Sequence, residues 1–330
     1  MSRSSHLTIV VPGALERWAN AVSKESLLAR VAGRGEIARA WDASSQEHAS
    51  LNPWQRGLLA ALRLDERHHP SAPLTALGMG LEAGEWVHAE PVHFAAGLNE
   101  VALVPLRGAA ALAEQELDAL TPTLAAHFAD SGLAMHRGPR GWLIKSPTPW
   151  RARTVMVDYA RTHEWGEVLP SGDGAAQLRR WMTEAQMLLH DHAVNDARTA
   201  RGLPAANALW LWGNGPKIEV REQGEISCIG CNGYLRGICR AHSWPPPTEI
   251  HSMQELLTVA RARARTVAMV EAHDLNDFES QHLTTLLDAL RAGAIQRLTL
   301  VLDEWRIDID RWRWRRFWRG ALPLTEWSRA

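Results

Sequence analysis

The residues best suited to chemistry lie in a polar segment that runs into a glycine-rich turn. Between positions 190 and 215, the end of an expected helix is followed by a polar loop rich in histidine, asparagine and arginine. The apolar run Ala208–Trp212 then leads into Gly-Asn-Gly. The forked N–H donors of an arginine guanidinium and free backbone N–H groups both bind phosphate or carboxylate. The segment therefore predicts a pocket for an anion, although asparagines that cap the loop would produce the same pattern. The residues expected to contact the anion are His192, Asn195, Arg198, Asn207, Gly213, Asn214 and Gly215.

A second cluster has zinc-type ligands. The sequence Cys228-x2-Cys231-x7-Cys239-x2-His242 supplies three thiols and an imidazole, the side chains that hold structural zinc. However, Cys228 and Cys231 fall on an expected strand, where residues three apart point to opposite faces. Cys239 falls inside an expected helix. The spacing favours small buried thiols, with zinc as the alternative.

The C-terminal stretch 305–319 interleaves arginine with tryptophan and phenylalanine. Arginine and aromatic rings together can hold phosphates and stack on bases, which would suit nucleic acid. A terminal segment that docks its tryptophans on the core while arginine faces water has the same pattern. We expect docking, and keep an interaction surface as the alternative.

These residues are positioned by an alternation of short apolar strands and helices. The run Leu7–Val11 is β-branched and ends at Pro12-Gly13, which predicts a buried strand followed by a loop. Further strands are expected at 208–212, 225–231, 266–271 and 297–302, with helices between the last three. This spacing is typical of βαβ units and predicts a mostly parallel sheet covered on both faces. The stretch 86–146 instead predicts a small α+β unit that ends in a hairpin.

The composition is that of an ordinary globular protein. The chain has 330 residues, 46% hydrophobic residues and a net charge of −1, so global charge indicates no particular partner. Three cysteines cannot form a disulfide framework, and no long apolar run follows Met1. We therefore expect a cytoplasmic protein without a membrane segment.

The segment 192–215 resembles a known family. Its pattern His-x-Val-Asn-x-x-Arg, then Gly-x-Pro-Ala-x-Asn-x-x-Trp-x-Trp-Gly-x-Gly, is similar to a segment of the cofactor-independent phosphoglycerate mutases of archaeal type, in the alkaline-phosphatase superfamily. The similarity is closest to a proteobacterial offshoot of Rpf-type regulatory proteins. The resemblance implies an α/β fold with an alkaline-phosphatase-like, mostly parallel sheet covered by helices and a smaller inserted α+β domain. The expected domains are 1–85 for the first part of the core, 86–150 for the insertion, and 151–330 for a linker helix and the rest of the core.

The resemblance also implies a two-metal phosphomutase site, and this chain departs from it in three places. The family has Asp-Gly after its first strand, a serine or threonine nucleophile before a helix, and Asp-His after its last core strand. This chain has Pro12-Gly13, Asn52-Pro53 and Asp303-Glu304 there. If a site for Mn, Mg or Zn were retained, its ligands would be Glu271, His273, Asp274, Asp277 and Asp303.

From these departures we expect a degenerate phosphoglycerate mutase-like protein, a non-catalytic pseudoenzyme with a regulatory role. We expect it to need no cofactor, and to bind a small phosphorylated or carboxylated metabolite or a protein partner rather than a membrane or a nucleic acid. One alternative is a divergent metal-dependent phosphoglycerate mutase or phosphatase. The other is a nucleic-acid or protein interaction module that uses the C-terminal Arg/Trp segment.

Overall fold

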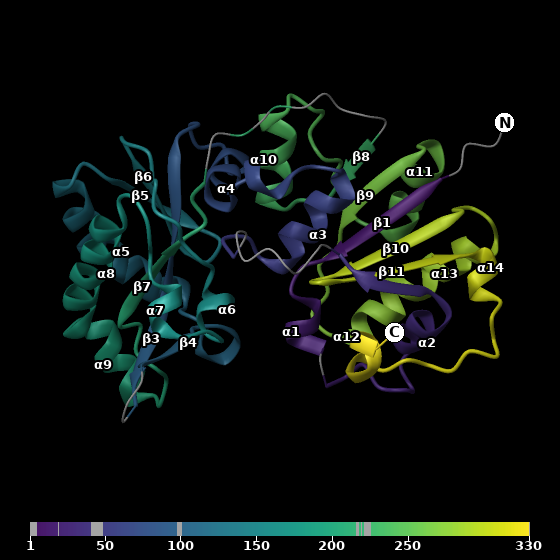
Figure 1. The fold of residues 1–330 in the computed structure, drawn as a ribbon, viewed down its shortest axis with the longest axis horizontal. Helices are drawn as coiled ribbons and strands as arrows, with labels where there is room; N and C mark the ends of the chain where they lie inside the picture. The colour runs from purple at the N-terminus through teal and green to yellow at the C-terminus, as the bar shows by residue number, and fades with distance from the viewer. Residues whose placement is uncertain are drawn as a thin grey trace. The chain divides into compact units, whose positions relative to one another are not determined.

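The chain folds as two compact units, each with its own sheet (Figure 1). The parallel-sheet unit comprises residues 1–46, 52–66 and 220–330, and the antiparallel-sheet unit comprises residues 47–51 and 67–219. The computed structural model describes residues 5–18, 20–40, 49–97, 101–215, 218, 220 and 226–329.

The parallel-sheet unit is built on six strands in the order β2-β11-β10-β1-β9-β8. Strands β8, β9, β1 and β10 run parallel, and β11 and β2 are each antiparallel to their neighbours. The carboxyl ends of the four parallel strands therefore meet at one edge of the sheet, which we call the carboxyl edge. The strands are β1 (His6–Val11), β2 (Glu36–Arg39), β8 (Ile226–Ile229), β9 (Arg265–Met269), β10 (Arg297–Leu302) and β11 (Trp305–Asp310).

Helices cover both faces of this sheet, as a parallel sheet requires. One face places Leu300 and Leu302 in a single apolar core with residues of α2, α11 and α13. Val301 alternates with these leucines and meets α3 on the opposite face, where a Cβ on Gly57 would lie 2.4 Å from Cγ1 of Val301. The helices are α1 (Ala14–Trp18), α2 (Leu27–Arg34), α3 (Pro53–Leu62), α10 (Gly233–Ala241), α11 (Met253–Ala262), α12 (Leu275–Asp277), the π-helical turn η4 (Phe278–Leu283), α13 (Thr284–Arg291), α14 (Arg311–Trp314) and η5 (Leu324–Arg329).

The antiparallel-sheet unit is an α+β unit organised around the long strand β3. β3 pairs with β4, β6 and β7, and β5 pairs with β6. Its apolar core combines strand residues such as Trp142 and Trp210 with α5 and α8. The elements are α4 (Ser71–Gly78), β3 (Glu85–Ala96), β4 (Val101–Pro105), η3 (Gly108–Ala110), α5 (Glu114–Asp130), β5 (Ala134–Gly138), β6 (Gly141–Ser146), α6 (Val157–Ala160), α7 (Trp165–Val168), α8 (Ala175–His190), α9 (Ala193–Ala200) and β7 (Ala208–Trp212); η2 (Glu66–His68) joins the two units in sequence.

The mixed α/β fold with a smaller α+β unit is confirmed, but its boundaries differ from those expected. The insertion was expected at 86–150, whereas the second compact unit extends over 67–219. The reason is β7, a strand expected in the parallel sheet, which pairs antiparallel with β3 over residues 88–92. Helix α8 packs on β7, so both elements belong to the α+β unit.

Two strands were not expected. These are β2, which precedes α3 in the chain, and β11, which lies in the Arg/Trp-rich C-terminal stretch. Together they extend the parallel sheet by two antiparallel strands. Among the described residues, every helix is too short or too polar to cross a bilayer.

Candidate functional site

The asparagines expected to contact an anion are bonded to the protein's own backbone. Asn195 Nδ2 donates to the carbonyls of Leu189 and Ala206, and its Oδ1 accepts from the Ala206 N–H at 2.7 Å. Asn207 exchanges two hydrogen bonds with the backbone of Phe94. The Asn214 side chain likewise bonds to neighbouring loop residues, namely Trp150, Ala152 and Thr154. These contacts match the interpretation of a capped loop rather than an anion pocket.

Arg198 is fully buried and also has protein partners. Its guanidinium pairs with Glu116 at 2.7 Å, and donates to the carbonyls of Pro204, Ala111 and Ala110. With no exposed surface, this side chain has no open direction toward a ligand. The expected role in anion contact is therefore replaced by a structural one.

The remaining residues of that expected pocket are turn and cap residues. His192 is the N-cap of α9, where its Nδ1 accepts from the Val194 N–H at 3.3 Å. Gly213 has a φ of +82° and donates its N–H to Thr154 Oγ1. A Cβ on Gly215 would lie 2.7 Å from Pro70 Cβ, so this glycine serves close backbone packing.

Asp303 lies at the carboxyl edge, directly after β10, where the resemblance implies a metal ligand. Its two carboxylate oxygens accept hydrogen bonds from the N–H groups of Gly13 and Leu15, both at 2.8 Å. These donors belong to the loop after β1 and to the start of α1. Burial raises the pKa of Asp303 to about 6, although the two N–H groups oppose the shift. Both oxygens thus hold a neighbouring loop in place.

The pKa of Asp303 predicts an unusual pH dependence for the parallel-sheet unit. The Asp303 carboxyl stays protonated up to about pH 6 in the folded state but only up to about pH 4 in the unfolded state. Its contribution to the free energy of unfolding therefore falls as pH rises from about 4 to 6. Burial also lowers the pKa of His6 to about 4, and this contribution rises with pH over nearly the same range. The two groups offset each other in the wild type. In Asp303→Asn only the His6 contribution remains. The free energy of unfolding of this variant should therefore increase as pH rises from 4 to 6, by up to about 1.4 kcal/mol per pH unit.

Urea unfolding at pH 4, 5, 6 and 7 measures this dependence. The matched variant is His6→Gln, which removes the opposing group and should lose stability over the same interval. Parallel pH profiles for Asp303→Asn, His6→Gln and the wild type would contradict the assignment.

The other expected metal ligands follow β9 but do not converge. Asp274 Oδ1 accepts from the Asp277 N–H and so caps α12, and Asp277 accepts a hydrogen bond from Gln281. Glu271, His273 and Asp274 are exposed. Within the described residues, no three His, Cys, Asp or Glu side chains come together in a way that could hold a metal ion. The residues present therefore do not fit the two-metal site that the resemblance implies.

The zinc alternative is wrong for the same reason, since the three cysteines and His242 form no metal-binding group in the described part of the chain. Cys228 and Cys239 are buried, whereas Cys231 is exposed. A hydrogen bond with Cys239, together with burial, raises the pKa of the Cys228 thiol well above its usual range. The His242 ring stacks on Trp244, with the ring centroids 4.9 Å apart. The expectation of buried thiols is confirmed for Cys228 and Cys239 and is wrong for Cys231, which is exposed.

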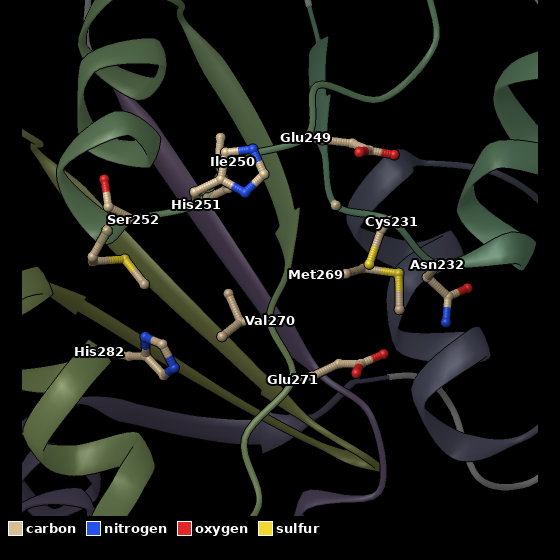
Figure 2. Close-up of a pocket in the computed structure, with 12 residues that line it drawn as sticks. Cys231, Asn232, Glu249, Ile250, His251, Ser252, Met269, Val270, Glu271 and His282 are labelled. Carbon is tan, nitrogen blue, oxygen red and sulfur yellow. The ribbon is translucent and has the colours of Figure 1, made fainter.

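A cavity of about 370 Å³ lies at the carboxyl edge of β8 and β9 (Figure 2). In an open α/β sheet, ligands bind outside the carboxyl ends of the strands. The lining comes from the turns after these strands, the loop before α11 and the π-helical turn η4. Its polar residues are Cys231, Asn232, Glu249, His251, Ser252, Glu271 and His282.

Two helices begin at this cavity. Asn232 caps α10 by accepting from the N–H groups of Tyr234 and Leu235, and Ser252 caps α11 by accepting from the Glu255 N–H. Helix N-termini have a positive potential that favours anions. Glu249 lies at the same cavity but pairs with Arg236. The cavity can thus take a negatively charged group at its helix ends.

His282 and Glu271 give the cavity its remaining chemistry. His282 lies in η4, and its Nδ1 is buried with no hydrogen-bond partner in the described part of the chain. Burial lowers the pKa of His282, so the ring is neutral at pH 7 and can donate or accept one hydrogen bond. The exposed Glu271 carboxylate can accept from a ligand hydroxyl. π-Helical turns are rare and frequently occur at functional sites.

Sequence reasoning included Cys231 and Glu271 but missed the other polar residues of this cavity. The pattern Ser252-x-x-Glu255 is a capping box and could have located the start of α11. No local pattern in the sequence marks His282, which lines the cavity from the π-helical turn η4.

Comparison with curated proteins shows a local similarity. Over 81 residues the chain is 50% identical to a 2,3-bisphosphoglycerate-independent phosphoglycerate mutase of Methanothrix thermoacetophila. This chain contains a phosphoglycerate mutase-like segment. A probable enzyme of the same description from Geobacter sulfurreducens is 41% identical over 49 residues. The matches cover 23% and 15% of this chain and only 21% and 12% of those two proteins, and no family model matches.

The solved structures compared with this chain include the cofactor-independent phosphoglycerate mutase from Thermoplasma acidophilum. That comparison has a TM-score of 0.42 and 14% identity, and covers 93% of this chain and 90% of the other. A protein from Pyrococcus horikoshii gives a TM-score of 0.49 and 12% identity, with 94% and 88% covered. The mutase-like segment therefore rests on the sequence comparison. Similarity to the regulatory-protein offshoot stays a prediction.

Proposed function

We propose that this phosphoglycerate mutase-like protein binds a small hydroxy acid, phosphorylated or carboxylated, in the cavity at the carboxyl edge, in a regulatory role. The observation that supports this most is the meeting, in one cavity of about 370 Å³, of two helix N-termini with the neutral imidazole of His282, whose Nδ1 has no hydrogen-bond partner among the described residues. The anionic group lies at the helix ends. The hydroxyl of the ligand donates a hydrogen bond to Glu271, and the His282 ring forms a hydrogen bond with a carbonyl or hydroxyl oxygen of the ligand.

We further propose that the protein does not transfer phosphoryl groups by a two-metal mechanism. Such a mechanism places two cations about 3.5–4 Å apart, held by converging carboxylates and imidazoles. Here the two oxygens of Asp303 bond to Gly13 and Leu15, and Pro12 stands where the family has a ligand aspartate.

Three free cysteines, one of them exposed, support a cytoplasmic location.

Isothermal titration calorimetry with 3-phosphoglycerate and with D-glycerate tests the binding proposal. We expect measurable heat with at least one of them. Glu271→Gln replaces a charge-assisted hydrogen bond to the ligand by a neutral one, and His282→Leu removes a hydrogen bond. Each variant should therefore raise Kd about tenfold. Glu326→Gln, on the far C-terminal turn η5, is the matched control and should leave Kd unchanged.

Three outcomes would overturn the proposal. The binding part fails if neither compound binds at millimolar concentration, or if both cavity variants bind as the wild type does. The non-catalytic part fails if the protein converts 3-phosphoglycerate to 2-phosphoglycerate in the presence of Mn²⁺, which would favour the divergent mutase instead.

A further inference from the structure

The aromatic side chains near the C-terminus fall into two groups. Trp305, Trp314 and Trp327 are buried, as docking on the core predicts. Trp312, Phe317 and Trp318 are instead 74%, 79% and 70% exposed. Of the large apolar side chains that are exposed in the described part of the chain, the aromatic ones all lie in residues 311–320, which we call the basic aromatic segment. Docking therefore accounts for only half of these rings.

The basic aromatic segment is also strongly cationic. It contains five arginines and no acidic residue. Arg313 pairs with Glu36 at 2.5 Å and lies 3.6 Å from Asp310. Among the described residues, the other four, Arg311, Arg315, Arg316 and Arg319, have no carboxylate partner. A surface with this excess of charge is complementary to an anionic partner.

Three of these arginines surround a recessed space. Arg313, Arg316 and Arg319 line a pocket of about 540 Å³ next to the end of α2. The backbone packs closely there, because a Cβ on Gly33 would lie 1.9 Å from the carbonyl oxygen of Gly320. Glu36, which also lines this pocket, is neutralised by Arg313. The remaining guanidiniums provide planar, forked donors of the kind that bind phosphate.

The exposed rings are arranged for stacking. The Arg315 guanidinium lies over the Trp312 ring, 5.3 Å from its centroid. Phe317 and Trp318 meet edge to face at 81°, with centroids 5.4 Å apart, so their faces point in different directions. Rings in several orientations suit successive bases of a flexible strand better than a flat lipid surface, into which apolar groups insert together.

We propose that the basic aromatic segment binds single-stranded nucleic acid. A backbone phosphate occupies the arginine-lined pocket, and neighbouring bases stack on Trp312, Phe317 and Trp318. This function is independent of the cavity at the carboxyl edge, and it departs from our expectation that the chain has no nucleic-acid partner. Duplexes bind less well, because their bases are already stacked on each other.

Fluorescence anisotropy with a labelled 12-nucleotide single-stranded oligonucleotide tests the proposal on the full chain at several salt concentrations. Trp312→Ala/Phe317→Ala/Trp318→Ala should raise Kd at least about tenfold without changing the salt dependence. Arg316→Ala/Arg319→Ala should weaken binding and reduce the magnitude of the slope of log K against log salt by about 0.7, the value for one phosphate of a single strand. Exposed residues elsewhere provide matched controls, Met187→Ala and Arg151→Ala/Arg180→Ala, which should bind as the wild type.

The proposal is overturned by absence of oligonucleotide binding, by equal affinity for a duplex of the same length, or by wild-type affinity in both segment variants. Vesicles of phosphatidylcholine and phosphatidylserine are a separate arm. Binding to these vesicles without binding to the oligonucleotide would assign the segment to anionic membrane surfaces instead.

Discussion

Arg198→Ala should lower the free energy of unfolding of the antiparallel-sheet unit by about 3–5 kcal/mol, because it takes the donor away from three backbone carbonyls and removes the buried one of the two arginines that pair with Glu116. Arg198 has no exposed surface and bonds to Glu116 and to three backbone carbonyls. Its removal takes this donor away from the three carbonyls, whereas Glu116 keeps Arg201 and the Ala113 N–H as partners. Urea unfolding followed by circular dichroism measures the loss.

Arg201 provides a matched control for this variant. It pairs with the same carboxylate, Glu116, but its side chain is 54% exposed. Surface pairs of this kind contribute at most about 1 kcal/mol, so Arg201→Ala should have a small effect. If Arg198→Ala cost no more than Arg201→Ala and abolished ligand binding instead, Arg198 would be a ligand contact after all.

His88→Gln should remove much of the acid sensitivity of the same unit. Burial, with a smaller effect of Arg140, lowers the pKa of His88 to about 3. His88 bonds to Ser71 Oγ at 3.0 Å and stacks on Trp212, with ring centroids 4.5 Å apart. The unfolded histidine takes up a proton near pH 6.5, whereas the folded one does not.

The sign follows from this difference in proton uptake. The stability contributed by neutral His88 is complete above pH 6.5 and is lost as pH falls toward about 3. The expected slope is about 1.4 kcal/mol per pH unit over this range. Unfolding curves between pH 7 and 4 should be flatter for His88→Gln, whatever its stability at pH 7. His163→Gln, at an exposed ring stacked on Tyr159, should retain the wild-type slope. An unchanged slope in His88→Gln would show that other groups cause the acid sensitivity.

Short apolar runs were sufficient to locate most strands. The runs 7–11, 208–212 and 297–302 all form strands, because β-branched and apolar residues bounded by turn residues have few other structures available. The strand with which each run pairs could not be predicted in this way. The run 208–212 pairs with β3 rather than with the parallel sheet, since an apolar run encodes burial and not the identity of its neighbour.

The candidate site shows the same division. Residue types at the carboxyl edge were visible in the chain, but Asp303 could face a metal or the N–H groups of the β1 loop, and only the fold decides between them. Asn195 and Arg198 had the composition of an anion pocket, yet their polar atoms bond to backbone that lies far away in sequence or across a tight turn. Hydrogen-bond partners of this kind depend on distance in space.

The α/β class, most of the strands and the mutase-like segment could be predicted from the amino-acid sequence, because they depend on local composition and on order along the chain. Three properties became visible only in the folded protein: the expected anion contacts are internal bonds, Asn232, Ser252 and His282 share a cavity, and Trp312, Phe317 and Trp318 stay exposed. Those properties depend on which distant surfaces are in contact, since burial and hydrogen bonding are satisfied by neighbours in space.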